Sequence, residues 1–200
     1  ADAAGRDHLE FLLEIMGRPR WLDPGNTRTL NTGRAADVIK LAAEKAGWGK
    51  RLPGGRGLGL AFYFSHAGHF AEVAEVSVDG NRKVTVHQVT VAADVGPIVN
   101  MSGAENQCQG AVIDGLSTTL GLGLSIENGR VQESNFDQYP LLRIGSAPKV
   151  DVHFIQSEYA PTGLGEPALP PIAPAVCNAI FAATGFRVRE LPLAKEGFSV

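Results

Sequence analysis

Apolar residues recur every three or four positions in four stretches of the chain, which is the spacing of one buried helix face. The four stretches are residues 7–16, 34–46, 108–120 and 172–184. Asp7 suits the N-cap of the first stretch, and Pro171 and Pro174 suit the first turn of the last. Gly17 and Gly47 follow the first two stretches, where helices commonly end on glycine. The pattern predicts four helices.

Apolar and polar residues alternate in other stretches, as expected for strands with one face in a core. These stretches are residues 58–65, 69–78, 83–92, 124–126, 130–132 and 150–156. Asp79-Gly80-Asn81 and Glu127-Asn128-Gly129 separate neighbouring stretches and are typical of tight turns between antiparallel strands. Helices and strands together predict an α+β fold of largely antiparallel strands with packed helices.

Residues 50–59 separate the predicted N-terminal helices from the predicted strands. They are rich in glycine and proline and are interpreted as a linker. It divides a helical N-terminal segment, residues 1–50, from an α+β lobe, residues 51–200. A single domain or two tightly joined lobes would both fit. The glycines at 54–59 do not predict a phosphate-binding loop, because they precede a strand and lack the Lys-Ser/Thr ending.

Composition excludes several classes of function. The 200-residue chain has a formal net charge of −3 and no run of Lys and Arg, which argues against nucleic acid or an anionic membrane surface as a partner. No apolar stretch approaches the roughly 18 residues of a membrane span. Cys108 and Cys177 lie in apolar stretches and are expected as buried thiols, with a disulfide as the less favoured alternative. The chain opens at Ala1 without a visible targeting signal, so we expect a trimmed or processed piece.

Four potential metal ligands, His66, His69, Glu72 and Glu75, are spaced three residues apart. On a helix they would form one stripe, but this stretch alternates like a strand, which would divide them between two faces. We therefore expect no metal ligands from this chain.

A single carboxylate, Glu166, stands between glycines and prolines in residues 163–171, just ahead of the last predicted helix. Glycine lets the backbone approach a ligand closely, and proline restrains the loop that presents the acid. Glu166 is therefore a candidate catalytic residue. A helix cap or an ordinary surface charge is the alternative for a glutamate in this position.

Several segments resemble the molybdenum-binding large subunits of the xanthine dehydrogenase family, and most closely the isoquinoline 1-oxidoreductase beta subunit and aldehyde dehydrogenase relatives. Gly165-Glu166-Pro167 followed by residues 171–185 is similar to the C-terminal signature of that family. The similarity continues in residues 46–49, 73–78, 107–111 and 134–140.

The resemblance implies part of the molybdenum cofactor-binding domain of a molybdenum hydroxylase. Such an enzyme hydroxylates an N-heterocycle or oxidises an aldehyde, with water as the oxygen source. Glu166 occupies the position of the family's catalytic base. Gln107 and Gly110 match the residues that contact the pterin, and Gly165 belongs to the cofactor-binding loop. Gln109 stands where relatives often carry Glu.

The family also implies a set of cofactors and partners. The complete subunit would bind molybdenum-molybdopterin cytosine dinucleotide, and 2Fe-2S clusters would lie on a small iron-sulfur subunit. Further partners would be the remainder of the large subunit, a small-molecule substrate and a cytochrome c acceptor. A bacterial periplasmic location is slightly favoured over the cytoplasm, and the isolated chain is expected to be inactive. The alternative is a non-catalytic scaffold or assembly lobe that retains the fold.

Overall fold

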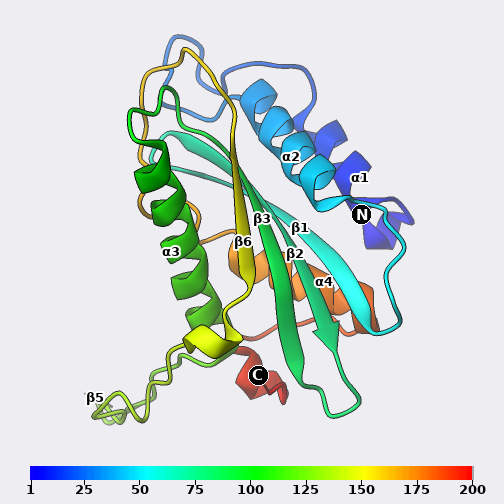
Figure 1. Cartoon of the computed structure of the whole chain (residues 1–200), viewed down its shortest axis with the longest axis vertical. Helices are drawn as coiled ribbons and strands as arrows, with labels where there is room; N and C mark the ends of the chain where they lie inside the picture. Colours follow the sequence, from blue (N-terminus) through cyan, green and yellow to red (C-terminus); the bar gives the residue numbers. More distant parts are fainter. Residues whose placement is uncertain (200) are drawn as a thin grey trace.

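The computed structural model of the protein describes residues 1–199 and confirms the predicted α+β class (Figure 1). Four α-helices accompany a four-stranded sheet and a small hairpin. The helices are α1 (His8–Met16), α2 (Thr32–Ala46), α3 (Met101–Leu120) and α4 (Ile172–Thr184), and the strands are β1 (Arg56–Ser65), β2 (Gly68–Val78), β3 (Val84–Asp94), β4 (Ile126–Glu127), β5 (Arg130–Val131) and β6 (Lys149–Phe154). Short 3-10 helices lie at Asp2–Ala4, Ile144–Ser146 and Leu193–Glu196.

The strand order in the main sheet is β1-β2-β3-β6. β1, β2 and β3 form an antiparallel meander, as the alternating pattern predicts. β6 pairs in parallel with the second half of β3, from Gln88 opposite Lys149 to Ala93 opposite Phe154. The sheet is therefore mixed, because the long connection through α3 brings β6 back to the sheet in the direction of β3.

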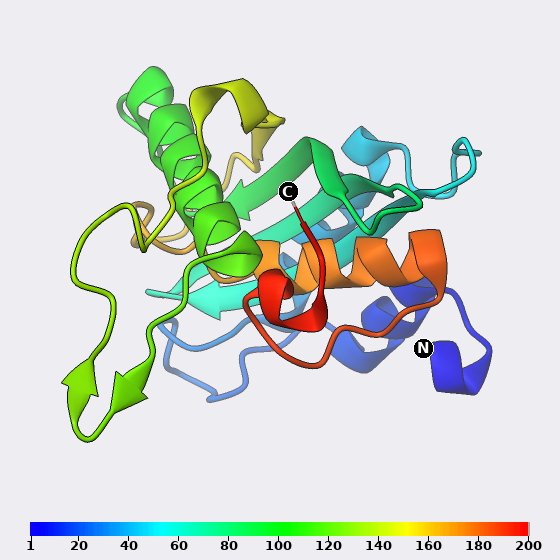
Figure 2. The ribbon, with the colours of Figure 1, turned by 90° about the horizontal axis from the view of Figure 1, so that it is seen from below.

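Helices cover both faces of the sheet (Figure 2), and an apolar core lies between the helices and each face. On one face α2 packs against alternate residues of the strands, and α1 lies outside it. That cluster contains Val38, Ile39, Ala42, Ala46, Leu60, Ala71, Val73 and Ala92. α3 and α4 cover the other face and share a larger core with the intervening strand positions. Residues 1–50 thus contact the sheet through α2, and the proposed division at residue 50 stays a prediction.

Side-chain caps set the helix starts. Asp7 caps α1 as predicted, because its Oδ1 accepts a hydrogen bond from the backbone N–H of Glu10 at 3.0 Å. α2 begins at Thr32, ahead of the predicted residue 34, because the side chain of Asn31 accepts from the N–H of Gly33 and Arg34. α3 begins at Met101, well ahead of the predicted residue 108, and Asn100 is its cap.

The linker interpretation of residues 50–59 is wrong for its second half, since residues 56–59 belong to β1. α4 crosses β1 here at backbone contact. A Cβ atom added at Gly59 would overlap the carbonyl oxygen of Ala175, and one at Gly57 would overlap that of Ala179. These glycines therefore serve the close approach of helix and strand rather than chain flexibility.

The predicted second hairpin is confirmed, although β4 and β5 have only two residues each. It forms the tip of an arm that projects away from the sheet (Figures 1 and 2). The arm exposes Leu124, Ile126 and Phe136, and these residues are 60–76% accessible.

Two expectations from composition can be compared with the described residues. Cys108 is buried, Cys177 is half-buried, and both are free thiols, as predicted. Within residues 1–199, no helix combines the length and apolar character needed to cross a bilayer.

Candidate functional site

Glu166 lies in the loop between β6 and α4. Backbone hydrogen bonds anchor the start of this loop, where Thr162 N–H donates to the Val95 carbonyl and Gly163 N–H to the His66 carbonyl, each at 3.1 Å. Glu166 itself is exposed, with its side chain 82% accessible. Its Oε2 lies 3.5 Å from Nε2 of His66. The loop is therefore held at its base and presents the carboxylate outward.

The structure brings Gln107 and the Glu166 loop together. A Cβ atom at Gly165 would lie 3.4 Å from Oε1 of Gln107, so α3 and the loop are in van der Waals range. Gly110 follows Gln107 by one helical turn, and a Cβ there would meet no atom within 4 Å. The predicted residues thus form one exposed surface beside the start of the loop.

A cleft of about 310 Å³ adjoins this surface. Its walls come from the segment after β3, the first turns of α3 and the start of the loop; Val95, Asn100, Gln107, Thr162 and Leu164 are among its lining residues. The walls are mainly apolar, with the amide of Gln107 at one side. Such a mixture of apolar walls and few polar groups is typical of sites for small organic groups.

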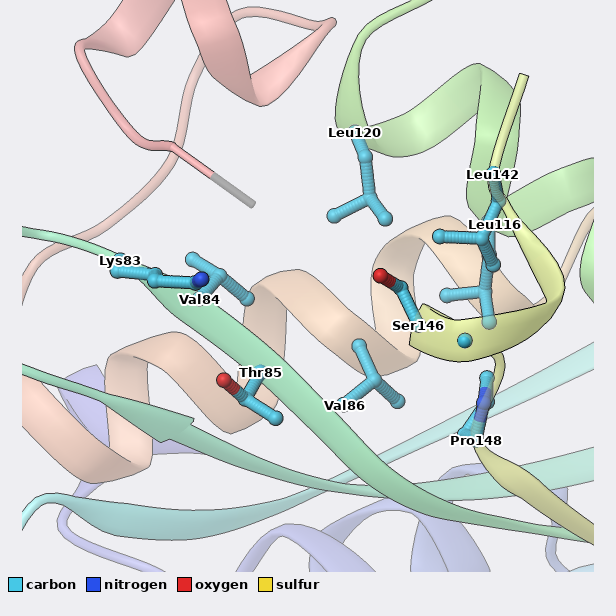
Figure 3. Close-up of a pocket in the computed structure, with 10 residues that line it drawn as sticks. Lys83, Val84, Thr85, Val86, Leu116, Leu120, Leu142, Ser146 and Pro148 are labelled. Carbon is cyan, nitrogen blue, oxygen red and sulfur yellow. The ribbon is translucent and has the colours of Figure 1, made fainter.

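A second cavity, of about 230 Å³, lies at the opposite end of α3 (Figure 3). Val84, Val86, Leu116 and Leu120 form its walls, and Figure 3 shows these side chains converging on it. Its polar groups are those of Lys83, Thr85 and Ser146. The cavity is remote from Glu166, and the candidate catalytic residues do not reach it.

A buried ion pair connects α2 with the end of β3. Arg34 Nε lies 2.7 Å from Oδ2 of Asp94, and its second guanidinium nitrogen donates to Oδ1 at 2.8 Å. The two side chains are only 4% and 3% exposed. Burial alone would raise the pKa of the Asp94 carboxyl, but hydrogen bonds from Arg34 and Ser157 outweigh it and hold that pKa below its usual value.

The same ion pair holds the segment that leads to the Glu166 loop. Ser157 Oγ donates to Oδ1 of Asp94 at 2.6 Å, and the ring of Tyr159 lies under the Arg34 guanidinium at 4.3 Å. Trp21 packs edge-on against Tyr159. Sequence reasoning missed this cluster, although an arginine on the apolar stripe of α2, one turn before Val38, is a signal for a buried partner.

Of the four potential metal ligands, His66 lies in the turn between β1 and β2, and the other three lie on β2, where they divide between its two faces as strand geometry predicts. His69 is buried and its Nε2 accepts from Asn31 N–H at 3.0 Å; burial, with the charge of Arg34, lowers its pKa to about 4. Glu75 pairs with Lys50 and Arg56, at 2.7 and 2.9 Å. In the described part of the chain, no group of three or more His, Cys, Asp or Glu side chains could hold a metal ion.

Glu72 is the second feature that sequence reasoning missed. It is fully buried in the core beneath α3 and α4, and neither carboxyl oxygen has a hydrogen-bond partner among residues 1–199. Burial raises its pKa well above the usual value, because a carboxylate without partners is disfavoured in the core. Cys108 lies close by, and burial, with the effect of Glu72, raises the pKa of its thiol to about 12.

Replacing Glu72 by Gln is expected to remove a pH dependence of stability. The folded pKa is raised above the unfolded value of about 4.3, so the folded protein keeps a proton that the unfolded chain loses. Wild-type stability should therefore fall with rising pH above the unfolded pKa, by up to about 1.4 kcal/mol per pH unit, relative to the variant. Urea unfolding at pH 5 and pH 8 measures this. Glu158→Gln, at an exposed position, is the control; a Glu72→Gln difference that does not change with pH would contradict the assignment.

The comparisons with known proteins agree on one family. The family model described as molybdopterin cofactor-binding domain matches residues 29–148. The membrane-bound aldehyde dehydrogenase [pyrroloquinoline-quinone] of Gluconacetobacter polyoxogenes is 35% identical over 197 residues, which cover 94% of this chain and 25% of that protein. The isoquinoline 1-oxidoreductase subunit beta of Brevundimonas diminuta is 34% identical over 191 residues, covering 92% of this chain and 24% of the relative. The chain thus spans about a quarter of the length of these curated relatives.

Solved structures share the fold. Quinoline 2-oxidoreductase from Pseudomonas putida 86 matches 63% of this chain and 17% of its own, with a TM-score of 0.59 at 18% identity. The aldehyde oxidoreductase from Desulfovibrio desulfuricans ATCC 27774 matches 62% of this chain and 14% of its own, with a TM-score of 0.56 at 25% identity. The resemblance found in the sequence is confirmed, and the chain belongs to the molybdopterin cofactor-binding domain family, as part of a molybdenum-binding subunit of the xanthine dehydrogenase type.

Proposed function

We propose that this chain carries the catalytic base, Glu166, of a molybdenum hydroxylase, and that the whole protein hydroxylates an N-heterocycle or oxidises an aldehyde with water as the oxygen source. The observation that carries the proposal is the meeting of Gln107 with the Gly165-Glu166 loop beside a cleft. These residues are far apart in the sequence, on a helix and on the loop before another helix. Relatives named for an aldehyde and for isoquinoline support both substrate classes.

The residues present fit a pterin cofactor. The side-chain amide of Gln107 is exposed and makes no hydrogen bond within residues 1–199, so both its donor and its acceptor are available to a pterin edge. The open space above Gly110 and the bare backbone at Gly165 would let a flat ring approach closely. Gln107, Gly110 and Gly165 would therefore hold the molybdenum-molybdopterin cytosine dinucleotide. When bound, the molybdenum centre supplies the activation of water and accepts the electrons of the oxidation.

Glu166 would accept a proton from the attacking water at one of its carboxylate oxygens. Pro167 after it and the anchored Gly163 before it restrict the loop, so the carboxylate is presented from a fixed base. The imidazole of His66, 3.5 Å away, faces the same carboxylate. Because Glu166 is exposed in this chain, the rest of the whole protein would cover the site and supply the remaining contacts to the cofactor, and the isolated chain is expected to be inactive.

Glu166→Gln in the complete enzyme tests the proposal. The amide keeps the shape of the side chain but cannot accept the proton, so the rate should fall by at least about 100-fold. Molybdenum and pterin content should remain at the wild-type level, because the residues assigned to cofactor binding are untouched. Glu158→Gln, at an exposed position outside the loop, should retain full activity. An unchanged rate in Glu166→Gln would remove Glu166 from the mechanism.

The exposure of Glu166 also favours a second candidate, a non-catalytic scaffold or assembly lobe that retains the fold. Molybdenum content separates the two. A natively expressed complex that contains this chain and stoichiometric molybdenum supports the enzyme, whereas a complex without molybdenum supports the scaffold.

The partners belong to the same proposal. Relatives carry subunit names, which supports the remainder of a large subunit and a small iron-sulfur subunit with 2Fe-2S clusters as neighbours. A cytochrome c acceptor and a periplasmic location follow from the family resemblance. Purification of the native complex, with its absorbance spectrum, would identify iron-sulfur clusters and haem.

A further inference from the structure

A large cleft lies at the end of α4 that is remote from Glu166. Its walls come from the N-terminal segment and the start of α1 and from the C-terminal part of α4 and the chain that follows, and its volume is about 630 Å³. Glu166 precedes the other end of the helix, and the 13 residues of α4 span about 20 Å at the usual rise per residue. The cleft is thus separate from the candidate catalytic surface.

Arg187 is fixed in the wall of this cleft. Its guanidinium lies 3.4 Å from the centroid of the Phe181 ring, and one of its nitrogens donates to Oδ1 of Asn178 at 3.2 Å. Asn178 is held in turn, because its Nδ2 donates to the carbonyl of Leu60 at 3.0 Å. No carboxylate among residues 1–199 forms an ion pair with Arg187. The structure therefore holds an oriented cation whose remaining N–H groups have no acidic partner.

The charged lining of the cleft consists of three arginines and two aspartates, Asp2 and Asp7, beside the rings of Trp48, Phe181 and His8. Arg189 also lines the cleft and has no ion pair within the described residues, whereas Arg6 is paired with Glu14. Trp48 forms part of the opposite wall, and its indole N–H is bound to Asp7 at 3.1 Å. That contact and the capping of α1 occupy the Asp7 carboxylate.

The pKa of His8, which also lines the cleft, agrees with a positive charge on Arg187 nearby. Burial is the main cause that lowers the pKa of His8, and the positive charge of Arg187 acts in the same direction. A fixed guanidinium pairs well with a carboxylate, because its planar N–H groups match the two oxygens. The flat face of Trp48 suits an aromatic ring, whereas Arg187 already covers one face of Phe181. The cleft also lies within the roughly 300–1,000 Å³ of common small-molecule sites.

We propose that this cleft binds an aromatic carboxylate, with its carboxylate on Arg187 and its ring against Trp48. The site is independent of the molybdenum chemistry proposed above, because it shares no residue with the Glu166 surface. Binding requires both the carboxylate and the ring of the ligand, because Arg187 recognises the charge and Trp48 contacts the ring.

Three probes test the two requirements on the whole 200-residue chain. Benzoate has both charge and ring, benzamide has the ring alone, and acetate has the charge alone. We expect benzoate to shift the NMR signal of the Trp48 indole N–H saturably, and the Trp21→Phe variant assigns that signal. Benzamide and acetate should bind at least about 10-fold more weakly, in line with the energy of a charge-assisted pair or an aromatic contact. Absence of a saturable shift, or equal binding of benzamide, would overturn the proposal.

Two substitutions test the assigned cation. Arg187→Met keeps the apolar stem and Arg187→Gln keeps a donor, and each should weaken benzoate binding at least about 10-fold, because the charge-assisted pair with the carboxylate is lost. Arg28→Met, an exposed arginine outside the cleft, is the matched control and should bind as the wild type does. Melting curves by circular dichroism establish that each variant is folded. Wild-type affinity for benzoate in either folded Arg187 variant would overturn the proposal.

Discussion

Arg34→Met is expected to lower the free energy of unfolding by about 3–5 kcal/mol, because it leaves the buried Asp94 carboxylate without its partner. All three hydrogen bonds from Arg34 to Asp94 are lost, and the donors that remain, the Ser157 hydroxyl and the Gly96 N–H, are neutral and cannot balance the buried charge. Urea unfolding followed by circular dichroism measures the loss. We also expect faster hydrogen exchange at Thr162 and Gly163, because the segment that Asp94 anchors leads directly to their hydrogen bonds.

The exposed pair of Lys149 and Asp151 provides the control for that experiment. Its atoms are 2.9 Å apart, similar to the buried pair, but its side chains are 71% and 30% accessible. Lys149→Met should therefore change stability by no more than about 0.5 kcal/mol. Combining Arg34→Met with Asp94→Leu should restore part of the loss, because an apolar pair needs no counter-charge. A loss below about 1 kcal/mol in Arg34→Met would show that Asp94 finds another partner.

Gly59→Ala is expected to cost at least about 3 kcal/mol, the upper end of usual overpacking penalties. The new Cβ would overlap the carbonyl oxygen of Ala175 and the backbone nitrogen of Ala179, and backbone atoms within a helix cannot turn aside. α4 would have to move away from β1, which opens the core that Ile172, Val176 and Ile180 help to form. Thermal or urea unfolding measures the effect.

Gly110→Ala is the matched control for Gly59→Ala. Gly110 lies in the interior of α3, and a Cβ there meets no atom within 4 Å. Alanine is favoured over glycine in a helix, so this variant should be more stable by roughly 0.5–1 kcal/mol. Wild-type stability in Gly59→Ala would mean that α4 and β1 are not in backbone contact.

Much of the fold could be predicted from the sequence because the apolar pattern follows local geometry. The four helices and the meander of β1, β2 and β3 are confirmed. The predicted start of α3, at residue 108, is later than the observed start at Met101. The first two turns of this helix are polar and partly exposed, so they carry no apolar stripe from which they could be predicted. The parallel pairing of β6 was not predicted, since alternation along a strand says nothing about its direction. The glycines of β1 resembled a linker because the helix that requires them lies more than 110 residues away.

The candidate site was predicted through the family resemblance rather than through local pattern. The structure brings Gln107 and the Glu166 loop together, but the roles of Glu166, Gln107, Gly110 and Gly165 stay predictions. Glu72 and the pair of Arg34 with Asp94 were missed for a common reason. Sequence patterns assign charged residues to the surface, and only the three-dimensional structure shows that Asp94 is a partner 60 residues from Arg34. Glu72 stands between the buried Phe70 and Ala74 on one strand face, which was a usable signal.

The mixed pairing of the sheet has a consequence for how the chain folds. β1, β2 and β3 pair with their neighbours in sequence, so their ladders form at a low entropic cost of loop closure. The parallel ladder between β3 and β6 closes a loop of more than 50 residues that includes α3. Nucleation should therefore begin in the meander, and the half of the molecule that carries Gln107 and the Glu166 loop should acquire its native contacts last.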